Sequence, residues 1–162
     1  MRNLKNLLFA FAVCVSAFAI IGCTDDDNNN NGNENAISQT IEIQGVKYSN
    51  VLGLYHQFEG EDEIHIDIDT DFTGDNNVHG FGFFDASLIG KTVEIKTDEQ
   101  FNISFNYMNG GNFTPRYKSG TLTITKKDKG YHILLNSVNA DDSAFKMDLL
   151  LIDEEEFNKS QQ

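Results

Sequence analysis

The chain has 162 residues, and its 25 acidic and 12 basic residues give a formal net charge of −13. An acidic surface of this kind repels the phosphates of nucleic acids and the headgroups of anionic lipids, so we expect no DNA or RNA partner. The chain is long enough to build one hydrophobic core, and it contains only two cysteines, Cys14 and Cys23.

The N-terminal segment has the pattern of a secretory signal. Arg2 and Lys5 give the first residues a positive charge, and Leu7–Ile21 is almost wholly apolar. A run of about 15 residues suits the hydrophobic region of a signal peptide, whereas a helix that spans a bilayer needs about 20. We therefore predict a signal peptide over residues 1–22, with an N-terminal membrane anchor as the alternative.

The end of this run, Ile20-Ile21-Gly22-Cys23, resembles the lipobox of bacterial lipoprotein precursors. In that family the cysteine is acylated and becomes the first residue of the mature chain. The resemblance implies that Cys23 carries acyl chains such as palmitate, and two or more such chains anchor a protein stably in a membrane. Cleavage would remove Cys14, Arg2 and Lys5, which leaves 10 basic and 25 acidic residues and a formal charge of −15.

Residues 23–38 consist of the cysteine and a polar segment, TDDDNNNNGNENAIS. This segment buries too little apolar surface to offset the entropy of ordering, so we expect a disordered tether. Its acidic run, Asp25–Asp27, resembles the export signal of surface lipoproteins in the Bacteroidota, which implies an outer-membrane protein that faces the cell exterior. Thr24 stands first and the run has no lysine, so a periplasm-facing protein is the alternative.

From Gln39 onward, apolar and polar residues alternate as they do in half-buried strands. In EIHIDIDT, Glu63–Thr70, three isoleucines share one face, and a histidine and two aspartates share the other. A turn is predicted at Gln44-Gly45 and a hairpin connection at Lys126–Gly130. The predicted strands cover residues 41–48 (with that turn inside), 51–58, 63–70, 79–85, 92–96, 101–107, 121–126, 130–136 and 144–152.

These segments amount to about eight or nine strands without a convincing helical pattern. They predict one all-β domain over residues 39–153, built as an antiparallel β-sandwich or barrel. Residues 154–162 are predicted to form an acidic, frayed C-terminal tail. Gly80-Phe81-Gly82 precedes no helix, so it is interpreted as a bend or close packing within a strand rather than a phosphate-binding loop.

A cluster of acids provides a candidate metal site. The cluster consists of Asp67, Asp69, Asp71 and Asp75. Carboxylate oxygens are the ligands that calcium prefers, but Phe72 and Val78 stand where an EF-hand requires glycine and a bidentate glutamate, so that motif is rejected. The two remaining interpretations are a looser calcium site in a β-loop and a solvated strand face followed by its turn.

No catalytic motif is evident in the sequence. The four histidines, His56, His65, His79 and His132, lack the spacing of metal ligands, and there is no nucleophile elbow or dinucleotide fingerprint. The acids between Glu59 and Glu63 have the pattern of a solvated loop. We therefore expect a protein that is not an enzyme and that needs no cofactor, calcium apart.

A predicted loop at residues 109–119 provides a candidate ligand site. It contains Phe113, Arg116 and Tyr117, and functional contacts concentrate on such loops. The other aromatic residues alternate as core residues do, and the chain has no tryptophan, which is the favoured platform for stacking on sugars.

Two further stretches, Ala86–Ile95 and Ser119–Asn136, resemble small β-rich lipoproteins of the Bacteroidota, which implies a β-sandwich or a lipocalin-like barrel. Asp142-Ser143-Ala144 resembles the O-glycosylation motif of the same bacteria, which implies a glycan on Ser143. Our hypothesis is a membrane-anchored binding or adhesion module for an extracellular glycan or protein. The alternatives are a lipocalin-like carrier of a small apolar ligand and a structural protein of the cell envelope.

Overall fold

The computed structural model describes residues 37–70, 77–96, 101–108 and 110–161. The predicted signal peptide, Cys23 and most of the tether lie outside these residues, as do Asp71 and Asp75. The described residues belong to one compact unit, Asn35–Gln162. Within the described ranges, no helix is both long enough and apolar enough to cross a membrane.

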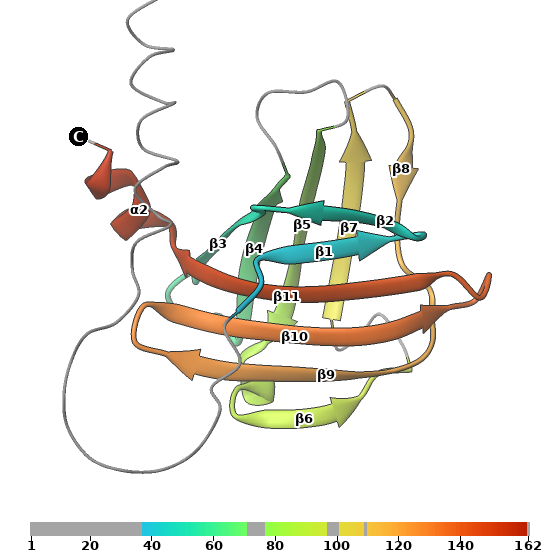
Figure 1. Cartoon of the computed structure of the whole chain (residues 1–162). Helices are drawn as coiled ribbons and strands as arrows, with labels where there is room; N and C mark the ends of the chain where they lie inside the picture. Colours follow the sequence, from blue (N-terminus) through green and yellow to red (C-terminus); the bar gives the residue numbers. More distant parts are fainter. Residues whose placement is uncertain (1–36, 71–76, 97–100, 109, 162) are drawn as a thin grey trace, which may run out of the picture. The chain divides into compact units, whose positions relative to one another are not determined.

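The described domain is all-β, as the alternating sequence pattern predicts, with one short α-helix at its end (Figure 1). Its elements are β1 (Thr40–Ile43), β2 (Val46–Ser49), β3 (Leu52–His56), β4 (Glu63–Asp69), β5 (Val78–Asp85), the 3₁₀ helix η2 (Ala86–Leu88), β6 (Lys91–Glu94), β7 (Phe101–Tyr107), β8 (Asn112–Phe113), β9 (Tyr117–Lys127), β10 (Gly130–Asn139), β11 (Ala144–Asp153) and α2 (Glu154–Ser160).

The strands form one continuous sheet with the order β6-β9-β10-β11-β3-β4-β5-β7-β8, and the β1–β2 hairpin pairs with β11. The predicted antiparallel pairing holds for these strands except where β11 and β3 run parallel, at Leu151–Asp153. The exception has a simple cause. β2 runs in the same direction as β11 because both pair antiparallel with β1, and β3 continues from β2 after only Asn50 and Val51.

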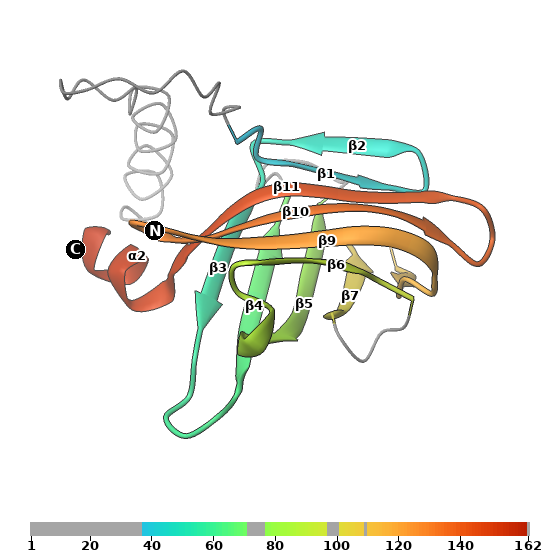
Figure 2. The same ribbon diagram turned by 90° about the horizontal axis from the view of Figure 1, so that it is seen from below.

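The sheet curls into two halves whose strands cross each other and face a common core, which gives the domain a barrel-like character (Figures 1 and 2). One half contains β6, β9, β10 and β11, and the other contains β3, β4, β5, β7 and β8. Packing of this kind buries the inward-facing side chains of both halves. The interior is filled with apolar side chains, the largest of which are Phe84, Phe101, Phe105, Phe145, Ile41, Ile43, Ile64, Ile66, Ile68, Ile95, Ile103 and Leu122.

The predicted turns and the close packing at Gly80-Phe81-Gly82 are confirmed. Gln44 and Gly45 adopt positive φ angles of 51° and 83° between β1 and β2, and Lys127 pairs with Gly130 across the β9–β10 turn. A Cβ atom on Gly82 would lie 2.1 Å from the carbonyl oxygen of Asn102. Glycine at position 82 therefore allows β5 and β7 to approach each other.

The C-terminal residues form helix α2 rather than the frayed end that we expected from composition. The carboxylate of Asp153 caps the helix by accepting hydrogen bonds from the N–H groups of Glu155 (2.9 Å) and Glu156 (3.1 Å). Three acids in the first turn and Lys159 in the last complement the helix dipole. The capping aspartate, the acids of the first turn and the lysine of the last turn are ordinary signals for the start and end of a helix. None of the helix residues is buried, however, so the sequence has no apolar stripe that would predict the helix.

Candidate functional site

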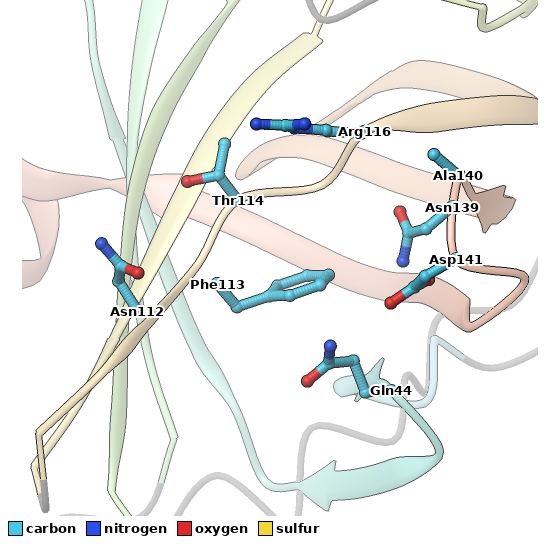
Figure 3. A pocket seen from close by; sticks show the side chains of 8 residues that line it. All are labelled: Gln44, Asn112, Phe113, Thr114, Arg116, Asn139, Ala140 and Asp141. Atoms are coloured by element: carbon cyan, nitrogen blue, oxygen red, sulfur yellow. The ribbon is translucent and has the colours of Figure 1, made fainter.

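A hollow of about 440 Å³ lies where three segments of the chain meet (Figure 3). The segments are the β1–β2 turn, residues 112–116 and the β10–β11 turn. The hollow is lined by Gln44, Asn112, Phe113, Thr114, Arg116, Asn139, Ala140 and Asp141. Apart from one aromatic ring and one alanine, the lining is polar, with three amides, one hydroxyl, one carboxylate and one guanidinium.

Backbone hydrogen bonds hold these three segments together. The N–H of Ala140 donates to the carbonyl oxygen of Arg116 (2.7 Å), and the N–H of Gln44 donates to the carbonyl oxygen of Ala144 (3.1 Å). The β10–β11 turn is itself closed by the N–H of Asn139, which donates to the carbonyl oxygen of Ser143 (2.9 Å). The walls are therefore preorganised, which lowers the entropy cost of binding a ligand.

Asn139 carries a buried acceptor without a partner. Its side chain Nδ2 donates to the hydroxyl of Ser143 (3.0 Å), whereas Oδ1 has no hydrogen-bond partner among the described residues, and the residue is only 3% exposed. An unsatisfied buried polar atom costs about 1–3 kcal/mol and calls for an explanation. The oxygen itself has almost no accessible surface, so a donor group on a ligand in the hollow would satisfy it after a small shift of the surrounding side chains.

Asp141 gives the hollow a negative charge. The hydroxyl of Ser143 donates to Asp141 Oδ1 (2.6 Å), as does the N–H of the same residue (3.0 Å). These hydrogen bonds, with a smaller contribution from the side chain of Gln44, hold the pKa of Asp141 below its usual value. The carboxylate is therefore ionised at neutral pH and acts as an acceptor toward a ligand.

The structure separates the three residues that we predicted to bind a ligand. Phe113 and Arg116 line the hollow, whereas Tyr117 does not. Phe113 and Tyr117 are each 8% exposed, and their rings pack against Phe145 at centroid distances of 5.8 and 6.3 Å. The predicted loop is partly strand, since β8 and the start of β9 lie within it. Ligand binding by these residues stays a prediction.

The predicted calcium cluster is only partly described. Asp67 and Asp69 are partly exposed residues of β4, and His79 of β5 lies beside them. His79 Nδ1 is 2.7 Å from Asp69 Oδ1, and Nε2 is 3.9 Å from Asp67 Oδ1. Among the described residues, no group of three or more His, Cys, Asp or Glu side chains is placed to hold a metal ion. Because Asp71 and Asp75 fall outside that part, the calcium site stays a prediction.

Ser143 lies in the β10–β11 turn, and its hydroxyl takes part in the network beside the hollow. It donates to Asp141 and accepts from Asn139. A glycan on this oxygen would replace the donated hydrogen bond. Glycosylation of Ser143 stays a prediction.

Another cluster contains a serine, an aspartate and a histidine, but the contacts among them differ from those of a catalytic triad. Asp148 is central: it accepts from the hydroxyl of Ser38 (2.7 Å) through Oδ2, and Oδ1 is 2.8 Å from His132 Nε2. A catalytic triad requires the histidine to contact the serine. Burial raises the pKa of Asp148, but the hydrogen bonds from Ser38 and His132 outweigh it, and the pKa is lowered.

Sequence reasoning missed most of the hollow. Gln44 and Asp141 lie in turns and Asn139 ends β10, and all three are residue types that ordinary polar turns and strand ends contain. Nothing local in the sequence indicates that two hairpin turns and residues 112–116 meet. No protein-family model, curated protein or solved structure matches the chain significantly.

Proposed function

We propose that the protein is a lipid-anchored surface module of the outer membrane that binds an extracellular glycan without catalysing a reaction. The observation that carries the proposal is the unpartnered, buried Oδ1 of Asn139 beside the ionised Asp141. A sugar hydroxyl donates one hydrogen bond and accepts others, so adjacent hydroxyls would satisfy both acceptors.

The remaining lining supports a neutral, hydroxyl-rich ligand. Gln44 and Asn112 offer amide donors and acceptors, and Arg116 offers donors. The volume of about 440 Å³ falls within the range of about 300–1,000 Å³ that is typical of ligand sites. Phe113 adds one aromatic side chain to the lining, although it is only 8% exposed and so offers a ligand little apolar surface.

The filled interior favours surface binding over the alternative of a lipocalin-like carrier. Such a carrier holds its ligand inside a hollow barrel, whereas apolar side chains from both halves of the sheet fill the space between them here. The hollow at Asn139 lies instead where two turns and an extended segment meet.

The proposed anchor is tested by acylation. Labelled palmitate should enter the wild-type protein and not the Cys23→Ala variant, because that cysteine is the acceptor which the lipobox-like sequence implies. Incorporation into both proteins would overturn the anchor. Protease treatment of intact cells should remove the domain if it faces the exterior, whereas protection until the outer membrane is opened would place it in the periplasm.

The proposed ligand is tested with an array of bacterial and host glycans, followed by titration calorimetry with the best binder. Asn139→Ala should weaken binding about fivefold, because a hydrogen bond between uncharged groups contributes on the order of 1 kcal/mol. Asn136→Ala is the matched control, since this exposed residue lies on the same strand outside the hollow.

Equal binding by the two variants, or no binding to any glycan, would refute the glycan site. Turnover of a bound glycan that is lost when one carboxylate is neutralised would refute the non-catalytic role.

A further inference from the structure

The outer face of strands β3, β4, β5 and β7 carries exposed aromatic side chains. On β5, Val78, Gly80 and Phe84 are buried on the core side, so that Phe81 and Phe83 point to the opposite face. Phe81 is 50% exposed, and Phe58, in the connection after β3, is 53% exposed. Exposed apolar groups that gather on one face mark interaction surfaces.

A hollow of about 210 Å³ lies on this face, and we call it the β5 hollow. It is lined by His56, His65, Ile66, Asp67, Phe81, Gly82, Phe83 and Asn102. The strand register places Asp67 directly opposite Phe81, and places His65 and Asn102 on either side of Phe83. A carboxylate and two phenyl rings therefore meet in a space of side-chain size.

Stacked histidines support one end of the β5 hollow. His56 and His65 are directly opposite each other in the β3–β4 register, and their rings stack at 5.2 Å with an interplanar angle of 7°. Phe58 packs edge-on against both rings, at 4.8 and 5.2 Å. Glu154 and Glu61 each contact one histidine, at 3.3 and 3.1 Å, so the rings are held in place.

The charge on this half of the sheet is one-sided. Residues 48–90 contain nine acidic residues and no lysine or arginine. None of the ten basic residues that follow Cys23 lies in β3, β4, β5, β7 or β8; they are Lys47, Lys91, Lys96, Arg116, Lys118, Lys126, Lys127, Lys129, Lys146 and Lys159. The field of such a surface attracts a cationic partner.

We propose that this face binds a basic segment of a partner protein, with one arginine side chain in the β5 hollow. A guanidinium group is planar, pairs with a carboxylate through two parallel hydrogen bonds, and stacks on aromatic faces. Asp67 supplies the carboxylate, and Phe81 and Phe83 supply the rings. The apolar stem of the arginine and its neighbours cover the exposed ring of Phe58.

The β5 hollow is separate from the glycan site, since the two hollows share no lining residue. Its chemistry also distinguishes a foreign partner from a second copy of this chain. Beyond Cys23 the chain has one arginine, Arg116, whose carbonyl and side chain belong to the first hollow, and its other basic residues are lysines. A preference for arginine over lysine therefore points to another protein.

The test uses the full-length chain in a non-ionic detergent and a fluorescein-labelled peptide, Gly-Arg-Gly-Arg-Gly, with its lysine counterpart. Fluorescence anisotropy at low and moderate salt reports binding. We expect the arginine peptide to bind at least about fivefold more tightly than the lysine peptide. Phe81→Ser and Asp67→Asn should each weaken it about tenfold. Both side chains are partly exposed, so these variants should fold.

Two control variants make equivalent changes at positions outside the β5 hollow. Glu94→Gln removes an exposed acid from β6, and Val46→Ser removes an exposed apolar side chain from β2. Both should bind the arginine peptide as the wild type does. Equal losses in Asp67→Asn and Glu94→Gln, or equal affinity for both peptides, would show only general attraction and overturn the proposal.

Sedimentation velocity without peptide tests whether a second copy of this chain covers the face instead. A dimer of the wild type that Phe81→Ser abolishes would show that a second copy covers this face, and it would overturn the proposed partner. The glycan proposal is tested independently of the arginine proposal, because different variants affect the two hollows. Phe81→Ser should keep full glycan binding, and Asn139→Ala should keep full peptide binding.

Discussion

Replacing Gly82 with alanine tests the packing of β5 against β7 most directly. The new Cβ would lie 2.1 Å from the carbonyl oxygen of Asn102 and 2.8 Å from the Cα of Ile103. Both are backbone atoms of β7, so neither can turn away, and Ile103 is buried beneath them. Overpacking costs about 1–3 kcal/mol when side chains can shift. Because strand β7 itself must move here, we expect a loss of about 3 kcal/mol or more.

Alanine substitutions at two other glycines provide losses of stability with which that of Gly82→Ala can be compared. A Cβ on Gly80 would lie 2.5 Å from the ring of Phe105, which is fully buried and packs against Phe113 and Phe145. A side chain has some freedom to adjust, so Gly80→Ala should cost about 1–3 kcal/mol. Gly60 has a φ of +85°, and no atom lies within 4 Å of the position that a Cβ would take. Gly60→Ala should therefore cost only the strain of a left-handed residue, about 1–2 kcal/mol.

Urea titrations followed by far-ultraviolet circular dichroism measure the free energy of unfolding of the three variants. A domain of this size is stable by about 5–15 kcal/mol, so a loss of about 3 kcal/mol is readily resolved. We expect the order Gly82→Ala, Gly80→Ala, Gly60→Ala from the largest loss to the smallest. A loss for Gly82→Ala no larger than that for Gly60→Ala would refute the close approach of the two strands.

Three further predictions concern polar groups. Because the pKa of Asp148 is lowered, its contribution to stability is present above its unfolded value of 3.8 and is lost as the pH falls through the folded value. Asp148→Asn should therefore lower the urea midpoint at pH 7 and have no effect in strong acid; a constant difference would contradict this. Ser137 donates to the carbonyl oxygen of Phe145 (2.7 Å) in the core, so Ser137→Ala should cost about 1–2 kcal/mol by urea titration, whereas no loss would mean that the bond contributes nothing. Burial, followed by the charge of Asp153, raises the pKa of Tyr55 to about 12. Asp153→Ala should lower that pKa in an ultraviolet titration and reduce helix content, and an unchanged Tyr55 titration would argue against the contact.

The sequence alone determined the class of the domain and most of its strands. Period-two alternation is a property of neighbouring residues, and the chain that buries Ile64, Ile66 and Ile68 must turn Asp67 and Asp69 outward whatever partner it has. Gln44-Gly45 likewise predicts a turn from local conformational preference. The signals that begin and end α2 are equally local, but the helix buries none of its residues, so no apolar stripe marks it in the sequence.

Only the tertiary structure decided which strands pair and which surfaces they create. The parallel contact of β3 with β11 depends on the path of an entire hairpin, and the hollow at Asn139 depends on turns that are about 95 residues apart in the chain, between Gln44 and Asn139. The same holds for the β5 hollow, where Asp67 meets Phe81 through the register of two strands. The pattern of buried and exposed residues follows from neighbouring positions in the sequence, whereas both hollows arise from the pairing of distant segments. A single sequence carries little information about that pairing.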